Sequence, residues 1–375
     1  MLLYIHFPFC RTKCGYCGFF SLPYSEVSCR EYFDLLLQEI AHRAKMVERP
    51  VKSVYIGGGT PSLLGADRLE MLLQSLFTSF EMTPEPEVTL EANPESALKT
   101  GVLNRAARTG VTRLSLGVQS LDNADLARLG RIHSREEAIR SYRLARECGF
   151  SNINLDLIWA LPGQTLSSWC RILEEAMFLG PEHLSCYGLT IEPDTVFAAK
   201  FDAGSLDLPP EDVQSGMFLE GSRLLREQGF VHYEISSFCR PGFASRHNMG
   251  YWSGEEYLGF GPGAVSTLGD KRWETPAHLL EYGSWVTNGL PDLPGEILTP
   301  SIRIAEQIML GLRTSQGLDL HKYTALSGKD LLQEHQQLIS MLLQQQLIEL
   351  GNGFLRLTEK GMLVSNSVIR TFLST

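Results

Sequence analysis

Long apolar runs are missing from this 375-residue sequence. No stretch reaches the roughly 20 consecutive apolar residues that a membrane-spanning helix requires. The first residues also lack a basic segment followed by an apolar core, which a secretory signal peptide would have. We therefore expect a cytoplasmic protein, in which the eight cysteines stay reduced and serve metal binding more readily than disulfides.

An excess of positive charge is also absent. The chain has 33 Lys and Arg residues against 43 Asp and Glu residues, so its formal net charge is −10 at pH 7. Because phosphate contacts need clustered Lys and Arg, we expect no general binding of nucleic acid. In other respects the composition, with 43% hydrophobic and 20% charged residues, is that of an ordinary globular protein.

Strand-length apolar runs alternate with longer amphipathic segments through the first half of the chain. This alternation is typical of repeated βα units around a parallel sheet. The expected strands are residues 2–6, 53–57, 87–91, 113–118, 153–158 and 184–189, and the expected helices are 31–47, 66–80, 96–109, 135–148 and 166–179. The pattern predicts an α/β fold in which residues 1–190 form a partial, six-fold (β/α) barrel.

The second half of the chain divides into two further regions. Residues 191–299 form a connecting region rich in Gly, Pro and aromatic residues, with one expected helix at 211–228 and one expected strand at 231–236. Residues 300–375 place helices at 301–313 and 330–346, an apolar Asn-Gly turn at 348–357 and a final helix, an order that resembles a winged helix. Seven basic against six acidic residues over 301–375 argue against DNA binding, so we interpret this region as a packing or partner domain.

A triplet of cysteines follows the first expected strand: Cys10, Cys14 and Cys17. Thiolates are favoured ligands of iron–sulfur clusters and of zinc. Buried structural cysteines on one helical face, or a redox pair at the last two positions, remain alternatives. A zinc site would need a fourth ligand, for which His6 is the near candidate. Since Pro8 and Gly15 disfavour a helix, we interpret the segment as a loop around a metal centre.

Further polar and glycine residues stand at the ends of the expected strands. A glycine run at 57–59 follows the second strand, Glu91 ends the third, Gln119 ends the fourth, and Asp156 lies in or at the end of the fifth. Because chemistry in parallel α/β folds collects beyond the carboxyl ends of the strands, we expect these residues to share one mouth with the cysteines. Taken singly, each of these polar residues is as consistent with a solvated or structural role as with a binding role.

With its place after a first strand, the CxxxCxxC spacing resembles the radical S-adenosylmethionine (SAM) superfamily. The resemblance implies that the three thiolates hold three irons of a [4Fe-4S] cluster and that the amino and carboxylate groups of SAM chelate the fourth. It also implies a set of SAM-binding residues, in which the aromatic residue before the third cysteine lies near the adenine. These residues are Tyr4, Tyr16, Gly57, Gly58, Gly59, Thr60, Glu91, Gln119, Arg131 and Asp156.

Longer motifs resemble the coproporphyrinogen III oxidase-like family over nearly the whole chain. They are Tyr4-Ile5-His6-Phe7-Pro8-Phe9-Cys10, the segments 57–62, 116–120, 156–158 and 161–165, and Leu189-Thr190-Ile191-Glu192-Pro193. This family contains the oxygen-independent oxidase and the HemW family of haem chaperones. The oxidase motif continues to a fourth cysteine where this chain has Phe19, and the oxidase carries an N-terminal extension that we do not find before the first strand.

A motif in the connecting region favours the chaperone branch. His247, Asn248, Tyr251 and Trp252 match the HNxxYW motif of HemW, and an imidazole is a good axial ligand of haem iron. The plainer alternative is a histidine that is hydrogen-bonded in a loop.

The resemblance implies a chaperone that binds haem, a [4Fe-4S] cluster and SAM, and transfers haem to apo-haemoproteins such as respiratory enzymes. A homodimer and a transient peripheral membrane contact are further options that it implies. Two other hypotheses stay open: a radical SAM enzyme that acts on a tetrapyrrole, and one that acts on an unrelated substrate. No catalytic residue is assigned.

Overall fold

Six parallel strands form the centre of the computed structural model, which describes residues 1–99 and 101–374. In sheet order they are β1 (Leu2–Phe7), β4 (Val51–Gly58), β5 (Met82–Ala92), β6 (Arg113–Gln119), β7 (Ile153–Trp159) and β8 (His183–Gly188). Strands such as β1 and β6 are buried along almost their whole length, as expected of a parallel sheet that is covered on both faces. The predicted partial (β/α) barrel is confirmed.

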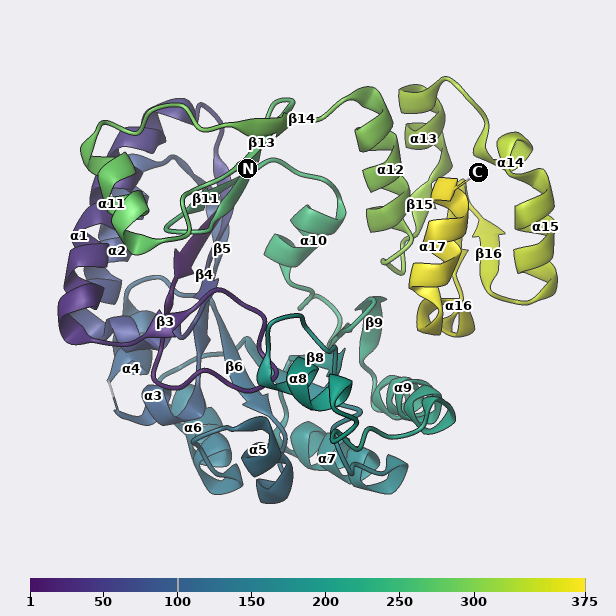
Figure 1. Ribbon diagram of the computed structural model, residues 1–375, viewed down its shortest axis with the longest axis horizontal. Helices are drawn as coiled ribbons and strands as arrows, with labels where there is room; N and C mark the ends of the chain where they lie inside the picture. Colours follow the sequence, from purple (N-terminus) through teal and green to yellow (C-terminus); the bar gives the residue numbers. More distant parts are fainter. Residues whose placement is uncertain (100, 375) are drawn as a thin grey trace.

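Helices cover the outer face of this curved sheet (Figure 1). They are α1 (Glu26–Arg43), α2 (Ala66–Ser79), α3 (Pro94–Lys99), α4 (Val102–Arg108), α5 (Asn123–Leu129), α6 (Arg135–Glu147) and α7 (Leu166–Leu179). The first begins earlier than predicted because the Ser25 side chain caps it by accepting from the backbone N–H of Ser28. The prediction of one helix over 96–109 is wrong, since Gly101 adopts a left-handed φ of 62° before α4.

The connecting region extends the barrel sheet at both edges. β11 (Tyr257–Phe260) pairs in parallel with β1, and β12 (Val265–Leu268), β13 (Lys271–Glu274) and β14 (Gly295–Ile297) follow in antiparallel order. β10 (Ser237–Cys239) and β9 (Val231–Glu234) extend the edge at β8. Over the part of the chain that the structure describes, the sheet therefore has 12 strands, whereas the sequence predicted a single strand, at 231–236, in the connecting region.

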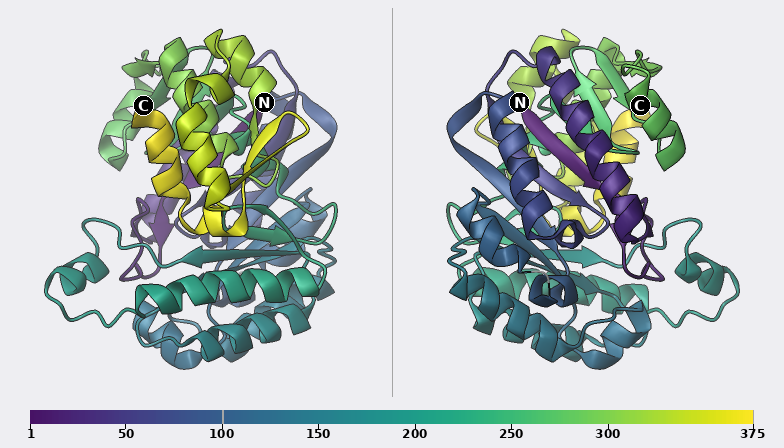
Figure 2. Two further views of the ribbon diagram at one scale, coloured as in Figure 1. Left: turned by 90° about the vertical axis from the view of Figure 1, so that its right-hand side faces the viewer. Right: turned by 90° about the vertical axis from the view of Figure 1, so that its left-hand side faces the viewer.

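Four helices also belong to the connecting region: α8 (Val196–Asp202), α9 (Glu211–Glu227), α10 (Arg246–Trp252) and α11 (Leu279–Thr287). Figure 2 shows α8 on an arm that projects from the barrel. In contrast, α10 lies on the inner side of the sheet, where it contacts β4 and the first helix of the C-terminal domain (Figure 1).

A buried ion pair attaches the β11 edge to the barrel. Arg43 and Glu39 of α1 pair with each other and are both almost inaccessible to solvent. The Arg43 guanidinium donates to the carbonyl oxygen of Gly259 (2.7 Å), and the Glu39 carboxylate accepts from the N–H of Gly261 (2.8 Å) and the hydroxyl of Tyr282 (2.7 Å). Because each charge has several partners, the pair is tolerated in the core.

The C-terminal residues form a winged-helix-like domain with its own apolar core. Its elements are α12 (Pro300–Gly311), β15 (Leu318–Asp319), α13 (Leu320–Ser327), α14 (Leu331–Glu334), α15 (Gln336–Gln344), β16 (Ile348–Gly351), β17 (Phe354–Leu357), α16 (Glu359–Leu363) and α17 (Ser365–Ser374). The predicted helix at 330–346 is interrupted at His335. As predicted, the β16–β17 hairpin turns at Asn352 and Gly353, both with positive φ.

Within residues 1–99 and 101–374, no helix combines the length and the apolar character needed to cross a bilayer.

Candidate cofactor site

The cysteine triplet lies in a loop that leaves β1 and returns to it. β2 (Phe9–Cys10) pairs in parallel with β3 (Leu22–Pro23), which closes the loop at its base. Near this base, the Nε2 atom of His6 lies 3.2 Å from the carbonyl oxygen of Phe20, and its Nδ1 atom lies 3.0 Å from the hydroxyl of Tyr4 on the same strand. The returning end of the loop is thus fixed to the first strand, and residues 11–17 form no helix, which excludes the helical alternative.

A cavity of about 480 Å³ opens between this loop and the carboxyl ends of the parallel strands. Its wall contains most of the residues predicted to bind a cofactor: Cys10, Cys14, Cys17, Tyr16, Gly58, Gly59, Thr60, Glu91, Gln119, Arg131 and Asp156. Tyr4 and Gly57 are not in the wall. Tyr4 contacts His6 behind it, and Gly57 packs against Tyr55 and Glu91. The strand-end rule therefore predicted the shared position of the cysteines, Gly58, Gly59, Thr60, Glu91, Gln119 and Asp156, whereas Tyr16 and Arg131 were named only from the family resemblance.

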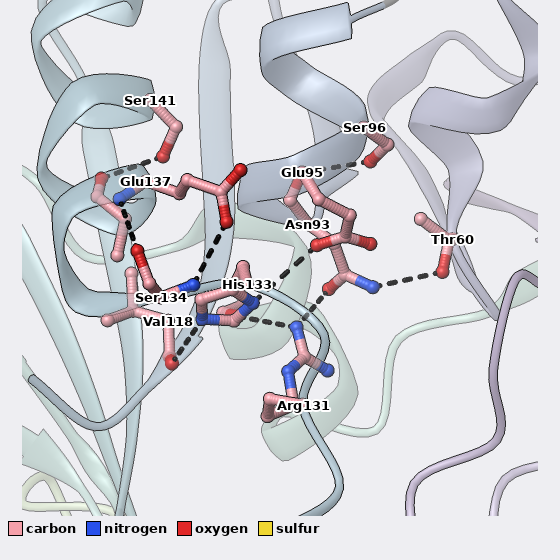
Figure 3. A network of polar contacts seen from close by, with 12 residues as sticks. Thr60, Asn93, Glu95, Ser96, Val118, Arg131, His133, Ser134, Glu137 and Ser141 are labelled. Carbon is pink, nitrogen blue, oxygen red and sulfur yellow. Dashed lines mark hydrogen bonds and ion pairs between the residues drawn. The ribbon is translucent and has the colours of Figure 1, made fainter. Parts of the chain in front are cut away.

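Arg131 connects two of the thiols to the ends of the strands. Its guanidinium donates to the Asn93 side chain (2.7 Å), to the carbonyl oxygen of Gly117 (2.8 Å) and to the Sγ atom of Cys14 (3.5 Å). Asn93 in turn donates to Thr60 (3.1 Å), whose hydroxyl donates to the Sγ atom of Cys10 (3.5 Å). Figure 3 shows Arg131, Asn93 and Thr60 in this chain. A cation fixed beside the thiols offsets the negative charge of a thiolate-bound centre.

Burial opposes ionisation of the thiols on their own. It raises the pKa of both Cys10 and Cys17, although a hydrogen bond from Thr60 partly offsets the effect at Cys10. A metal centre removes this penalty because a coordinated thiol is deprotonated by the metal.

The glycine run is required by close backbone packing. A Cβ atom on Gly59 would lie 2.5 Å from the carbonyl oxygen of Phe9, and one on Gly57 would lie 2.8 Å from the Tyr55 ring. Gly58 has a φ of 106°, a conformation that L side chains rarely adopt. These glycines allow the end of β4 to lie against the start of the cysteine loop and leave backbone groups open to the cavity.

Two carboxyl groups stand in the cavity wall. Glu91 accepts from the Tyr55 hydroxyl (2.6 Å) and from the N–H of Gly58 (3.2 Å), and Asp156 accepts from Ser115 (3.1 Å) and Asn154 (2.8 Å). Burial, reinforced by the charge of Asp156, raises the pKa of Glu91 to about 7. Burial also raises the pKa of Asp156. Without a cationic ligand, Glu91 is therefore neutral in mildly acidic solution.

This pKa predicts a pH-dependent stability of the ligand-free protein. The folded chain keeps the Glu91 proton up to about pH 7, whereas the unfolded chain loses it near the usual value of 4.5. The free energy of unfolding of the wild type should thus fall by roughly 3 kcal/mol, relative to that of Glu91→Gln, as pH rises from about 4.5 to 7. Urea unfolding across this range measures the difference. A difference that does not change with pH would show that Glu91 titrates normally.

The donor set fits a cluster better than a single ion. Within the described part of the chain, no three His, Cys, Asp or Glu side chains converge on one ion position. The three thiols instead stand around one cavity, as they must when each binds a different iron. A structural zinc ion would require four ligands at one point, so the zinc alternative lacks its geometry.

The HNxxYW motif lies elsewhere, on α10. The His247 ring is 1% exposed and its Nδ1 atom shares a hydrogen bond of 2.9 Å with the hydroxyl of Ser53 on β4. The rings of Tyr55 (5.1 Å) and Tyr251 (4.8 Å) pack against it. Burial lowers the pKa of His247 to about 3, so the imidazole is neutral. Asn248, Tyr251 and Trp252 are partly exposed.

The structure therefore separates the motif helix from the cofactor cavity. Tyr55 stands between them, with its hydroxyl at Glu91 and its ring against His247. Sequence reasoning missed Tyr55 and Asn93. Asn93 comes directly after β5 and so stands at a strand end, where functional residues are expected. Tyr55 is two residues before Gly57 on β4, so the two share one face of the strand.

Two family models and several known proteins match this sequence. The family model of the radical SAM superfamily matches residues 4–176, and that of the HemN C-terminal domain matches residues 298–364. The "Heme chaperone HemW" of Bacillus subtilis is 35% identical over 375 residues, which are 99% of this chain and 98% of that protein. The protein of the same name from Escherichia coli is 39% identical over 264 residues, 70% of this chain and 68% of that one.

A solved structure is similar as well. The coproporphyrinogen III oxidase HemN from Escherichia coli, described as a radical SAM enzyme, superimposes with a TM-score of 0.84 at 26% identity. The match covers 99% of this chain and 89% of that one.

Proposed function

The chain belongs to the HemW family of the radical SAM superfamily, and on this basis we propose that it is a haem chaperone. It binds haem together with a [4Fe-4S] cluster and SAM, and transfers the haem to apo-haemoproteins such as respiratory enzymes. Relatives named as haem chaperones match it over 99% of its length. We place this activity in the cytoplasm and include a homodimer and a transient peripheral contact with a membrane in the proposal.

The cofactor cavity supports the cluster and SAM. The three thiols would hold three irons, and the residues beside them would hold SAM: Tyr16, Gly58, Gly59, Thr60, Glu91, Gln119, Arg131 and Asp156. A reduced cluster of this kind supplies the electron that cleaves bound SAM in radical enzymes. The residues of this chain provide the rest: Arg131 offsets charge at Cys14, and the glycines present backbone groups.

One observation carries the haem part of the proposal. The neutral ring of His247 has a buried Nε2 atom without a hydrogen-bond partner among the described residues. A buried polar atom without a partner is rare, and a free imidazole nitrogen is what an axial haem ligand must offer. Phe19, 71% exposed in the cysteine loop, takes the place of the fourth cysteine of the oxidase motif and supports the chaperone over the oxidase.

Haem titration of the wild type and of His247→Ala tests the ligand. The wild type should give the Soret spectrum of a histidine-ligated haem. The variant should shift this spectrum and raise the haem dissociation constant by roughly tenfold or more, because loss of a direct ligand exceeds the usual effect of losing a supporting residue. His278→Ala, which removes an exposed histidine, is the control and should bind haem like the wild type. Identical spectra for wild type and His247→Ala would remove the assignment.

The enzyme hypothesis has its own test. The reconstituted protein is incubated with reductant, SAM and either coproporphyrinogen or haem. A chaperone leaves the tetrapyrrole unchanged, whereas a new porphyrin product formed at a substrate-dependent rate would refute the proposal.

A further inference from the structure

The helix that carries the haem motif is attached to the barrel by a buried carboxylate. Glu87 of β5 is 4% exposed and accepts from the backbone N–H groups of Arg246 (3.0 Å) and His247 (2.9 Å) and from the Ser245 hydroxyl (3.4 Å). The first N–H groups of a helix have no partners within the helix, and a negative charge at that end is favourable. Glu87 therefore serves as the main polar contact between α10 and the sheet.

Other contacts hold the helix in the same position. Ser53 binds the His247 ring, and the Arg246 side chain donates to the carbonyl oxygen of Glu85 (2.9 Å). The backbone of Gly250 lies so close to β1 that a Cβ atom there would be 2.6 Å from the Leu2 side chain. The helix is thus docked along β1, β4 and β5.

This docked position conflicts with haem ligation by His247. A ligand nitrogen must touch the iron, and the porphyrin around the iron needs an open face, but the imidazole is almost completely covered. The unpaired Nε2 atom has the right chemistry for a ligand and has no access. Two glycines with positive φ, Gly242 and Gly254, flank the helix, and no atom of the described residues lies within 4 Å of the place where their Cβ atoms would be. They provide hinge positions on both sides.

We propose that α10 is a latch, and that Glu87 and Ser53 control haem loading by holding it in a closed position that covers His247. Haem binds after α10 leaves β4 and β5, so the apparent dissociation constant depends on the small fraction of molecules in which the helix is released. This inference rests on the proposed function, since it takes His247 as the haem ligand.

Weakening the latch should tighten haem binding. Glu87→Gln keeps the shape of the side chain and removes its charge, so more molecules have a released α10. We expect the haem dissociation constant to fall roughly tenfold, because hydrogen bonds to a charged group are stronger than those to a neutral one. Ser53→Ala should lower it to a smaller extent. Glu85→Gln is the matched control: its exposed side chain lies on the same strand, its carbonyl contact is kept, and its haem affinity should equal that of the wild type.

Hydrogen exchange of the unmodified protein gives a second measurement. Glu87 protects the amides of Arg246 and His247 in the closed position. Adding haem should speed exchange at these two amides if the helix is released. The iron content of the reconstituted cluster checks that each variant is folded. If Glu87→Gln fails this check, Ser53→Ala and the exchange data test the latch instead.

The latch and the ligand can fail separately. If His247→Ala changes the Soret spectrum but Glu87→Gln and Ser53→Ala bind haem no more tightly than the wild type, the latch is wrong and the ligand stands. Slower or unchanged exchange at Arg246 and His247 on haem binding leads to the same conclusion. If His247→Ala leaves the spectrum unchanged, both are wrong.

Discussion

Replacing Cys10, Cys14 and Cys17 with Ala removes the iron and the acid-labile sulfide from the reconstituted protein. The three thiols line one cavity, and Arg131 and Thr60 already contact two of them. Elsewhere in the described ranges, 1–99 and 101–374, no three His, Cys, Asp or Glu side chains converge on one ion position. Iron and sulfide analysis, with the charge-transfer absorption of the cluster, measures the loss, which should be complete.

The control is the double variant Cys148→Ala and Cys170→Ala. Both thiols are partly buried and lie on helices α6 and α7 or directly after them, away from the cavity. This variant should keep the full iron content. If the triple variant also kept it, the cluster ligands would lie elsewhere. Because α10 is separate from the cavity, the triple variant should still bind haem.

Gly59→Ala should destabilise the protein and prevent SAM binding. The new methyl group would lie 2.5 Å from the Phe9 carbonyl oxygen and 2.8 Å from its carbonyl carbon, and both are backbone atoms that no rotamer can move. Relief requires the end of β4 to separate from the start of the cysteine loop, where the N–H of Gly59 now donates to Phe7 (2.7 Å). We expect the free energy of unfolding to fall by about 3 kcal/mol, at the upper end for overpacking. Urea unfolding and calorimetric SAM titration measure the two effects.

Gly216→Ala is the matched control for this substitution. Gly216 lies within α9, and the nearest atom to its added Cβ would be a Leu166 methyl at 3.8 Å, an ordinary contact. Alanine favours a helix by up to about 1 kcal/mol over glycine, so this variant should be as stable as the wild type or more so. Unimpaired SAM binding by Gly59→Ala would mean that the loop adapts to the methyl group.

Local signals account for the part of the fold that the sequence predicted. The six barrel strands and most of the helices follow from apolar periodicity, and helices begin at N-caps such as Ser134 and Thr165. The added strands β11 to β14 are at most four residues long, and β11 pairs with a strand at the opposite end of the chain. No local pattern specifies such a partner, which explains why the prediction contained none of the strands β11 to β14.

The site also divides into a part that sequence position predicts and a part that depends on long-range contacts. The thiols, Thr60 and Glu91 come together because the ends of parallel strands meet, a rule that operates on sequence position alone, whereas Arg131 follows α5 and reaches the thiols through its long side chain. The burial of His247 on α10 depends on Ser53, Glu87 and Leu2, which belong to three different strands, β4, β5 and β1. The motif identified the residue, but only the tertiary contacts of α10 determine whether its ring is accessible.

The placement of β1 between β4 and β11 has a consequence for synthesis of the chain. The strand that leads to the cysteines leaves the ribosome before every other strand of its sheet, and β4 can pair with one of its edges early. Its other edge has no partner until residues 257–260 have been made, which at typical rates of translation takes on the order of 10–40 s. During this interval an apolar strand edge is open to aggregation. A cluster delivered to the cysteine loop during synthesis would therefore bind to a barrel whose sheet is still incomplete.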